Sequence, residues 1–122
     1  MRILFLDDDP ERQRRVRTAL VGTVLYAVET AADAIRVLSE HEFDVVMLDH
    51  DLGGEIHQPS DETSGYGVAA AIANGDGKRP GMVVIHSFNG PGAVKMMVVL
   101  SEAKIPTVWA PFGTSLDALV LC

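Results

Sequence analysis

The sequence predicts an α/β fold in which a five-stranded parallel sheet is doubly wound, with helices on both faces. Five short apolar runs alternate with amphipathic or alanine-rich runs along the 122 residues. Such alternation favours a parallel sheet, and right-handed crossovers place helices on both of its faces. The run at 45–48 is apolar throughout, as expected for a central strand covered on both sides. A chain of this length supports one core, so we expect a single domain over 1–122.

The first unit is an apolar strand over 3–6 that runs into Asp7, Asp8 and Asp9. Asp9 followed by Pro10 indicates an N-cap with proline at the first helical position. Three apolar residues are expected on the inward face of this helix: Val16, Ala19 and Leu20. Four arginines of the same helix are expected mostly to face water: Arg12, Arg14, Arg15 and Arg17.

The second unit is a strand over 24–28 and a helix that Thr30 caps and that continues to about residue 38. Four residues of that helix are expected to share its inward face: Ala31, Ala34, Ile35 and Leu38. The third strand leads into a polar connection over 52–64, longer than the usual loop of about two to six residues. An alanine-rich helix over 65–73 follows.

The last two units are shorter. A strand over 82–85 and a tight turn over 90–92 precede a helix over 93–103. A fifth strand over 107–109 then leads to a final short helix, which a capping motif over 114–117 begins.

Composition excludes several classes of protein. The formal net charge of −7 makes nucleic-acid binding unlikely on physical grounds, since non-specific binding depends on cations that neutralise phosphates. The single cysteine, Cys122, cannot form an internal disulfide, which is typical of a reducing compartment. No apolar run is long enough to cross a bilayer, and the N-terminus runs directly into a strand. We therefore expect a cytoplasmic protein with no membrane segment and no signal peptide.

Acidic side chains follow two of the predicted strands. Asp7 and Asp8 come after the first strand and Asp49 comes after the third. Because the carboxyl ends of parallel strands share one edge of the sheet, where ligands bind, these carboxylates can meet. Clustered carboxylates repel one another and favour a hard cation such as Mg²⁺. Ser87, after the fourth strand, can offer a hydroxyl to the same space.

Four motifs fall in the order seen in two-component response-regulator receiver domains, and the chain resembles that family over essentially its whole length. The motifs are Leu6-Asp7-Asp8, the apolar strand ending at Asp49, Ser87, and Ala110-Pro111-Phe112. The resemblance implies a flavodoxin-like fold with strand order 2-1-3-4-5. It also implies a histidine kinase or a small phosphodonor as partner.

The resemblance further implies site roles. Asp49 is the expected phosphoacceptor, with Asp8 as a direct Mg²⁺ ligand and Asp7 acting partly through water. The main-chain carbonyl of Asp51 is the remaining expected protein ligand, and Ser87 is expected to sense the phosphoryl group.

The chain also departs from the family pattern. Ala110 replaces the lysine that usually precedes Pro-Phe and pairs with the phosphoryl group, and Thr107 stands where many receivers carry a switching aromatic residue. The Leu-Asp-His-Asp-Leu-Gly run over 48–53, with a later His-Ser-Phe-Asn-Gly-Pro-Gly run over 86–92, is more similar to an atypical subfamily, the cyclic-phosphate-processing receivers. That likeness adds phosphate-ester chemistry as an alternative.

Several residues have two interpretations. His50 and Asp51 are extra ligands or an acid–base pair, or His50 simply packs beside the strand end. Asn89 and Gly90 begin either an anion-binding cradle or an ordinary helix cap. His86 precedes Ser87, so strand alternation turns it away from a pocket that Ser87 faces, as a core residue or one behind the site.

The long connection, which contains His57, is either a solvated surface or a lid. The helix over 93–103 is apolar nearly all round, which favours a homodimer through this helix.

Three functions remain open from the sequence. The first is an atypical stand-alone receiver that accepts a phosphoryl group at Asp49 with Mg²⁺. The second is metal-dependent processing of a phosphate ester or cyclic phosphate at the same site, with His50 as the proton donor. The third is a degenerate receiver that acts only as a protein-binding module.

Overall fold

A computed structural model of the chain describes residues 1–52 and 59–111. Five strands and four helices alternate within these ranges, and they match the predicted order. The strands are β1 (Arg2–Leu6), β2 (Val24–Val28), β3 (Val45–Leu48), β4 (Met82–Ile85) and β5 (Thr107–Trp109). The helices are α1 (Pro10–Ala19), α2 (Ala31–Glu40), α3 (Gly65–Ala73) and α4 (Gly90–Glu102).

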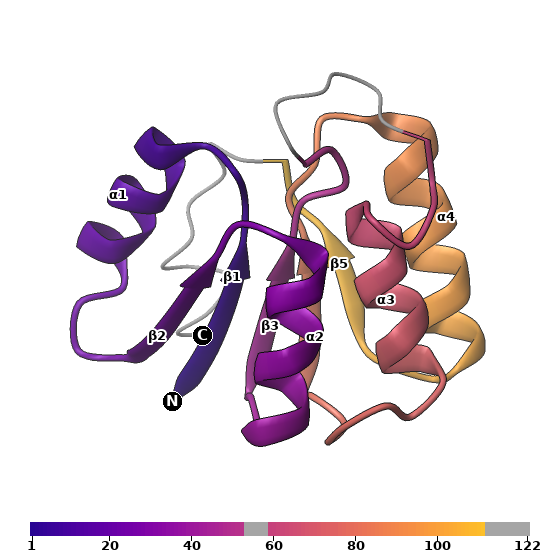
Figure 1. The fold of residues 1–122 in the computed structure, drawn as a ribbon, viewed down its shortest axis with the longest axis horizontal. Coiled ribbons are helices and arrows are strands. Elements are labelled where there is room, and N and C mark those ends of the chain that lie inside the picture. The colour runs from indigo at the N-terminus through magenta and orange to yellow at the C-terminus, as the bar shows by residue number, and fades with distance from the viewer. Residues whose placement is uncertain (53–58, 112–122) are drawn as a thin grey trace.

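The strands form one parallel sheet in the order β2-β1-β3-β4-β5. The predicted doubly wound, flavodoxin-like fold is therefore confirmed, including the strand order. Figure 1 shows α1 on one side of the strands and α2, α3 and α4 on the other. The central strand β3 is buried along its whole length, as its unbroken apolar sequence predicted.

Two apolar cores lie on the two faces of the sheet because successive side chains of a strand point to opposite faces. On one face Leu4 and Leu6 of β1 pack with buried residues of α2, α3 and α4. On the other face Ile3 and Phe5 pack with Val16 of α1. The alternation along β1 thus fixes which helices cover each face.

Helix starts follow the capping residues that the sequence indicated. The Asp9 carboxylate accepts hydrogen bonds from the Glu11 and Arg12 N–H groups, and Pro10 occupies the first turn. The Thr30 hydroxyl accepts a hydrogen bond from the Asp33 N–H. Local capping chemistry alone was sufficient to place both starts.

Three details of the predicted helices are corrected. The fourth helix begins at Gly90 rather than 93, because Asn89 caps it and Pro91 is tolerated in a first turn. The second helix continues to Glu40. Ala19 is exposed, although it was expected to face inward; Val16 and Leu20, four residues apart, share the buried face of α1 and leave Ala19 off it.

Parts of the predicted chain lie outside the described residues: the final helix over 114–117, Phe112, His57 and Cys122. Within the described residues, no helix is long and apolar enough to span a membrane.

Gly65 brings the start of α3 against the end of β3. Its N–H donates to the His50 carbonyl oxygen at 2.9 Å, and an added Cβ would lie 1.7 Å from the Asp49 carbonyl oxygen. We expect Gly65→Ala to lower the free energy of unfolding by about 3 kcal/mol or more, measured by urea denaturation, since backbone must move to admit the methyl group.

Gly90→Ala is the matched control because Gly90 also begins a helix. A Cβ there would meet only Trp109 Cη2 at 3.8 Å, an ordinary contact. This variant should change the free energy of unfolding by no more than about 1 kcal/mol. Equal losses in the two variants would contradict the close approach of α3 to β3.

Candidate functional site

The acidic residues that follow β1 and β3 lie side by side at the carboxyl edge of the sheet. Leu6 pairs with Leu48 in the parallel register, so Asp7 and Asp49 come next on neighbouring strands. Their main chains continue the sheet, since the Asp49 N–H donates to the Leu6 carbonyl oxygen at 3.1 Å. Carboxylate oxygens of Asp7, Asp8 and Asp49 all lie within 4.8 Å of one another. The structure therefore brings these three side chains together at this edge of the sheet, as the sequence predicted.

Burial of the cluster is uneven. Asp7 is fully buried and Asp49 is 6% exposed, whereas Asp8 is only half-buried. The cluster therefore has an inner side at Asp7 and an outer side at Asp8, from which an ion or a phosphate would approach.

Arg12 enters this cluster, although the sequence analysis expected it mostly to face water. Its guanidinium donates to both carboxylate oxygens of Asp7, with Nε–Oδ2 at 2.7 Å and Nη2–Oδ1 at 3.0 Å. Its Nη2 also lies 3.6 Å from Asp49 Oδ2, and the side chain is 28% exposed. The prediction was wrong for Arg12 because the buried Asp7 carboxylate needs a charged partner, and Arg12 is within reach of it. The other three arginines of α1 are exposed, as predicted.

One signal in the sequence could have found Arg12. It lies four residues before Val16, which faces the sheet, and i, i+4 positions share a helix face. A charged residue on that face, in the first turn after the acidic strand end, points at the cluster rather than at solvent.

The surroundings of Asp49 disfavour its carboxylate form. Burial and the neighbouring Asp7 carboxylate raise the pKa of Asp49 to about 7, against the opposing effect of the Arg12 guanidinium. The His50 main-chain N–H also donates to Asp49 Oδ1 at 2.9 Å. Near neutral pH this carboxyl is consequently divided between its acid and its carboxylate, and a bound cation would favour the carboxylate.

His86 lies beneath the cluster and is 2% exposed, as the alternation argument predicted for a residue beside Ser87. Its ring stacks on Phe5, and its Nε2 donates to the Leu6 carbonyl oxygen at 3.2 Å. Its Nδ1 lies 3.7 Å from Asp7 Oδ2. Burial lowers the pKa of His86 to about 4, so the ring is neutral at pH 7 and supports the site without adding a positive charge.

His50 belongs to a different network, on the side of α3 and α4. Its ring is fully buried, with Nδ1 2.8 Å from Asp51 Oδ1 and Nε2 2.8 Å from Ser60 Oγ. The Asn89 amide also donates to Asp51 Oδ1 at 3.0 Å. The ring lies so close to Gly92 that an added Cβ there would be 2.6 Å from it. This arrangement favours packing beside the strand end, or an acid–base pair with Asp51, over ligation in the acidic cluster.

The start of α4 has the hydrogen bonds of a helix cap. The Asn89 N–H donates to Ser87 Oγ at 3.0 Å, and Asn89 Oδ1 accepts from the Gly92 N–H at 3.1 Å. Two N–H groups of this turn are thus already engaged, and Pro91 has none. These bonds favour the ordinary cap over an anion cradle at Asn89 and Gly90. Ser87 itself is 1% exposed at the end of β4.

The position of the usual lysine is apolar in this structure. Ala110 follows β5, is 6% exposed and packs in the core on the α1 face. Next to it, Trp109 is 40% exposed and its Nε1–H donates to the Ser87 carbonyl oxygen at 2.9 Å. Trp109 is therefore an optical probe bonded directly to the loop that follows β4.

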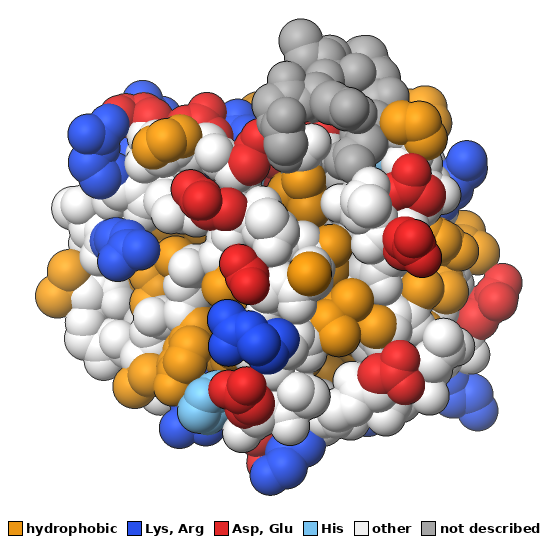
Figure 2. All heavy atoms as spheres, viewed as in Figure 1, with side chains coloured by type: hydrophobic (Ala, Val, Ile, Leu, Met, Phe, Trp, Pro, Cys, Tyr) orange, Lys and Arg blue, Asp and Glu red, His pale blue; other side chains and the backbone are white. Residues whose placement is uncertain are grey.

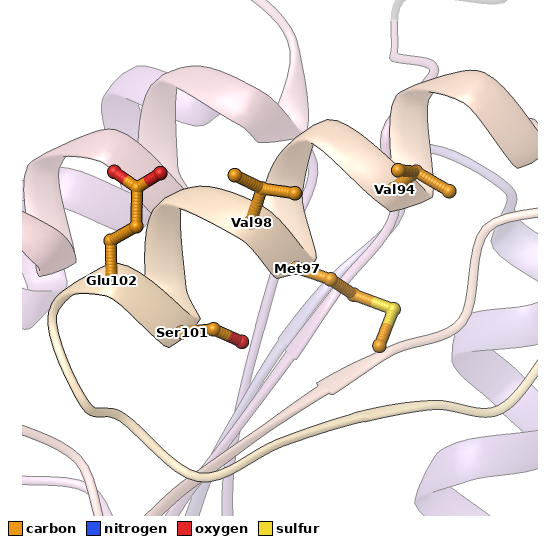
Figure 3. Close-up of a pocket in the computed structure, with 5 residues that line it drawn as sticks. All are labelled: Val94, Met97, Val98, Ser101 and Glu102. Atoms are coloured by element: carbon orange, nitrogen blue, oxygen red, sulfur yellow. The ribbon is translucent and has the colours of Figure 1, made fainter.

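A separate apolar surface lies on the outer side of α4. Figure 2 shows apolar side chains at the right-hand edge of the molecule, where Figure 1 places this helix. An open hollow there is lined by five residues of α4: Val94, Met97, Val98, Ser101 and Glu102. In Figure 3 Val94, Val98 and Glu102 form one row and Met97 and Ser101 the next. Apolar residues thus also cover the face of α4 that does not pack on the sheet.

The donor set of the acidic cluster fits Mg²⁺. Carboxylate oxygens are hard ligands that this ion prefers, and it commonly binds through one or two carboxylates while it keeps several waters. Among the described residues, the cluster of Asp7, Asp8 and Asp49 is the one such group close enough to hold a metal. The pairing of Asp7 with Arg12 is compatible with contact to the metal through water rather than directly.

Comparison with known families and structures gives one result for the sequence and one for the fold. The family model described as cyclic-phosphate processing receiver domain matches residues 2–102. A search of curated proteins found no match to this chain.

Solved receiver structures are similar in fold. A response regulator protein from Burkholderia pseudomallei, with a phosphorylated aspartic acid, calcium ion and citrate, is 16% identical with a TM-score of 0.66; the match covers 97% of this chain and 64% of that one. A CheY-like receiver domain from Methylobacillus flagellatus is 17% identical over 99% and 96% of the two chains, with a TM-score of 0.67. A response regulator from Thermotoga maritima, in complex with Mg²⁺ and BeF, is 21% identical over 97% and 91%, with a TM-score of 0.65.

The raised pKa of Asp49 predicts a pH-dependent gain in stability for Asp49→Asn in metal-free buffer. As pH rises from 3.8 to 7, the unfolded chain releases the Asp49 proton before the folded chain does, so stability is lost. The variant escapes this loss. Its advantage in unfolding free energy should grow from near zero at pH 4 to at most about 4 kcal/mol at pH 7.

Urea denaturation of both proteins across this pH range measures the difference and cancels the effect of His86. His86 changes stability with pH in the opposite direction to Asp49. Its lowered pKa gives stability that is present above pH 6.5 and is lost as pH falls towards 4. A difference that does not vary with pH would contradict the raised pKa of Asp49. Added Mg²⁺ should shrink the difference at pH 7.

Proposed function

Because the chain belongs to the cyclic-phosphate processing receiver domain family, we propose that it is a Mg²⁺-dependent phosphoacceptor that takes a phosphoryl group on Asp49. The convergence of the Asp7, Asp8 and Asp49 carboxylates within 4.8 Å at the sheet edge carries this proposal. A single receiver domain over 1–122 acting in phosphorelay signalling is part of it. The donor is a histidine kinase or a small phosphodonor.

Each residue of the site has a proposed part. Asp8 and Asp49 would hold Mg²⁺ directly, Asp7 through water, and Asp51 through its main-chain carbonyl. Bound Mg²⁺ supplies positive charge that neutralises the charge developing on the transferred group. The hydroxyl of Ser87 would then bond an oxygen of the phosphoryl group.

The reaction uses the carboxylate form of Asp49. One of its oxygens attacks the phosphorus of the donor, the bond from phosphorus to the leaving oxygen or nitrogen breaks, and an acyl phosphate remains. The pKa of Asp49 is raised to about 7 without a metal, so bound Mg²⁺ would also serve to hold Asp49 as the attacking carboxylate at neutral pH. Ala110 supplies no charge to the product, so labelling should be slow unless another cation takes that part.

The apolar outer side of α4 supports the further proposal of a homodimer. Val94 and Val98 are 51% and 49% exposed there, and large apolar residues in a contiguous patch commonly mark a protein interface. Sedimentation velocity over a range of concentrations measures the association, and Val98→Glu should abolish it. An unchanged monomeric profile for the unmodified chain would remove the homodimer.

A second candidate function is metal-dependent processing of a cyclic phosphate or another phosphate ester at the same acidic site. The description of the family, which names cyclic-phosphate processing, favours it. His50 is the expected proton donor. Its ring nitrogens bond Asp51 and Ser60, so proton transfer to a substrate requires the bond to Ser60 to open.

We expect acetyl phosphate with Mg²⁺ to add one phosphoryl group, at Asp49, as measured by intact mass. Asp49→Asn should remain unlabelled. Asp8→Ala should lose both Mg²⁺ binding, followed through Trp109 fluorescence, and labelling. Equal labelling of wild type and Asp49→Asn would show that Asp49 is not the acceptor.

A protein that binds neither Mg²⁺ nor a phosphoryl group would leave the third function, a constitutive protein-binding module.

Under the second function, His50→Ala should lower turnover of a 2′,3′-cyclic nucleotide by about 10²–10⁴-fold, the usual contribution of general acid–base catalysis. Metal affinity should change little because the carboxylates hold the ion. His41→Ala serves as the control, since the His41 ring packs at a tilt against Tyr26 and belongs to neither network. Wild-type protein that turns over no cyclic or linear phosphate ester with Mg²⁺ or Mn²⁺ would remove this function.

A further inference from the structure

The guanidinium of Arg12 faces the carboxylate oxygen of Asp49 that would carry a phosphoryl group. Asp49 Oδ1 accepts the His50 main-chain N–H at 2.9 Å, whereas Oδ2 lies 3.6 Å from Arg12 Nη2. The distance to Oδ2 is longer than a hydrogen bond, so the guanidinium approaches this oxygen without being bonded to it. The space beside Oδ2 is therefore lined by a cation.

Arg12 is held in this orientation by Asp7. The two bonds from Arg12 to Asp7, at 2.7 and 3.0 Å, form a fork that fixes the plane of the guanidinium. A guanidinium has five N–H donors. Two of them bond Asp7, Nη1 also lies 3.6 Å from Asp9 Oδ2, and Nη2 is the nitrogen that faces Asp49. Arginine is also the residue best suited to bind a planar carboxylate and a phosphate at the same time.

Arg12 brings a positive charge to a site that has alanine in place of the usual lysine. Ala110, at the end of β5, contributes a buried methyl group where receivers that this chain resembles have lysine. A doubly charged phosphoryl group on Asp49 would lie against Asp7 and Asp8, and it needs more positive charge than a metal ion alone provides.

We propose that Arg12 binds the phosphoryl group on Asp49 and so replaces the missing lysine from the opposite end of the chain. This inference rests on the proposed function, because it assigns a binding partner to the phosphoryl group of that reaction. In the free protein Arg12 acts as counter-ion to Asp7. After transfer Nη2, which already faces Asp49 Oδ2, donates to a phosphoryl oxygen while the fork to Asp7 keeps the side chain in place.

Removal of the Arg12 charge should change the affinity for Mg²⁺ and the affinity for a phosphoryl group in opposite directions. A guanidinium repels Mg²⁺ and attracts an anionic phosphoryl group, since both lie within a few ångströms of it. A residue that merely supports the fold would change both affinities in the same direction. The sign of the two changes therefore separates binding from support.

The experiment compares Arg12→Gln with Arg15→Gln, a control that removes the same charge from the same helix. Arg15 is exposed and its Nε lies 3.6 Å from Glu11 Oε1. Beryllofluoride serves as the phosphoryl mimic and is titrated at saturating Mg²⁺, with binding followed by ¹⁹F NMR; Mg²⁺ alone is titrated by calorimetry. A urea denaturation curve for each variant shows that it is folded under these conditions.

Arg12→Gln should weaken beryllofluoride binding by about tenfold or more, the value of a charge-assisted hydrogen bond, and should tighten Mg²⁺ binding. Arg15→Gln should leave both affinities within about twofold of wild type, as expected for an exposed charge. Because Arg12→Gln leaves Asp7 without its partner and can destabilise the fold, Arg12→Lys is measured as well. It keeps the charge and should retain more beryllofluoride affinity than Arg12→Gln.

Beryllofluoride affinity equal in wild type and Arg12→Gln would overturn the inference and leave Asp49 phosphorylation standing. Parallel weakening of both ligands in Arg12→Gln and Arg12→Lys would also overturn it, because that is the result for a supporting residue. Failure of the proposed function is recognised separately, by wild-type protein that takes no label from acetyl phosphate.

Discussion

The ion pair between Arg12 and Asp7 makes an acidic cluster at the buried edge of the sheet tolerable. Asp7 is fully buried beside Asp49, and an unpaired charge there would be strongly destabilising. The fork from Arg12 gives Asp7 a partner at 2.7 Å. His86 lies 3.7 Å from Asp7 but is neutral at pH 7, so it adds no positive charge. Burial, and after it repulsion from Asp7, therefore raises the pKa of Asp49. A cation that binds beside Asp49 relieves that repulsion.

The end of β3 serves two layers of the molecule because adjacent residues of an extended chain point in opposite directions. Asp49 turns towards the acidic cluster. His50 turns towards α4, where its ring joins Asp51, Ser60 and Asn89 and lies under Gly92. The second set of bonds connects the strand, the described end of the long connection and the start of α4. Asp49 is therefore one peptide unit away from a network that reaches two other segments.

The site also shows how a family pattern can be altered without losing its charge. The end of β5 carries Ala110 in an apolar environment, and Trp109 beside it bonds the loop after β4. The positive charge comes instead from α1, which is joined directly to the acidic end of β1. Arg12 is five residues from Asp7 in the chain, so the two become neighbours as soon as α1 follows β1, whereas a residue after β5 depends on the whole sheet being assembled.

Three features could be predicted from the amino-acid sequence: the fold class, the strand order through the family resemblance, and the acids that meet at the sheet edge. Strand positions such as 45–48 and helix starts at Asp9 and Thr30 depend on neighbouring residues, through apolar runs and capping bonds, so local reasoning was sufficient. Which carboxylates converge follows from parallel pairing, which brings every strand end to one edge.

How those residues interact depends on the folded molecule. The orientation of Arg12 depended on the buried charge of Asp7, and the partners of His50 include Asn89, 39 residues away in the chain. The raised pKa of Asp49 arises from the removal of water by packing, which no pattern of residue types records. Contacts of this kind are fixed by distances across the folded molecule, and it is these contacts that turn a row of aspartates into a candidate site for a metal and a phosphoryl group.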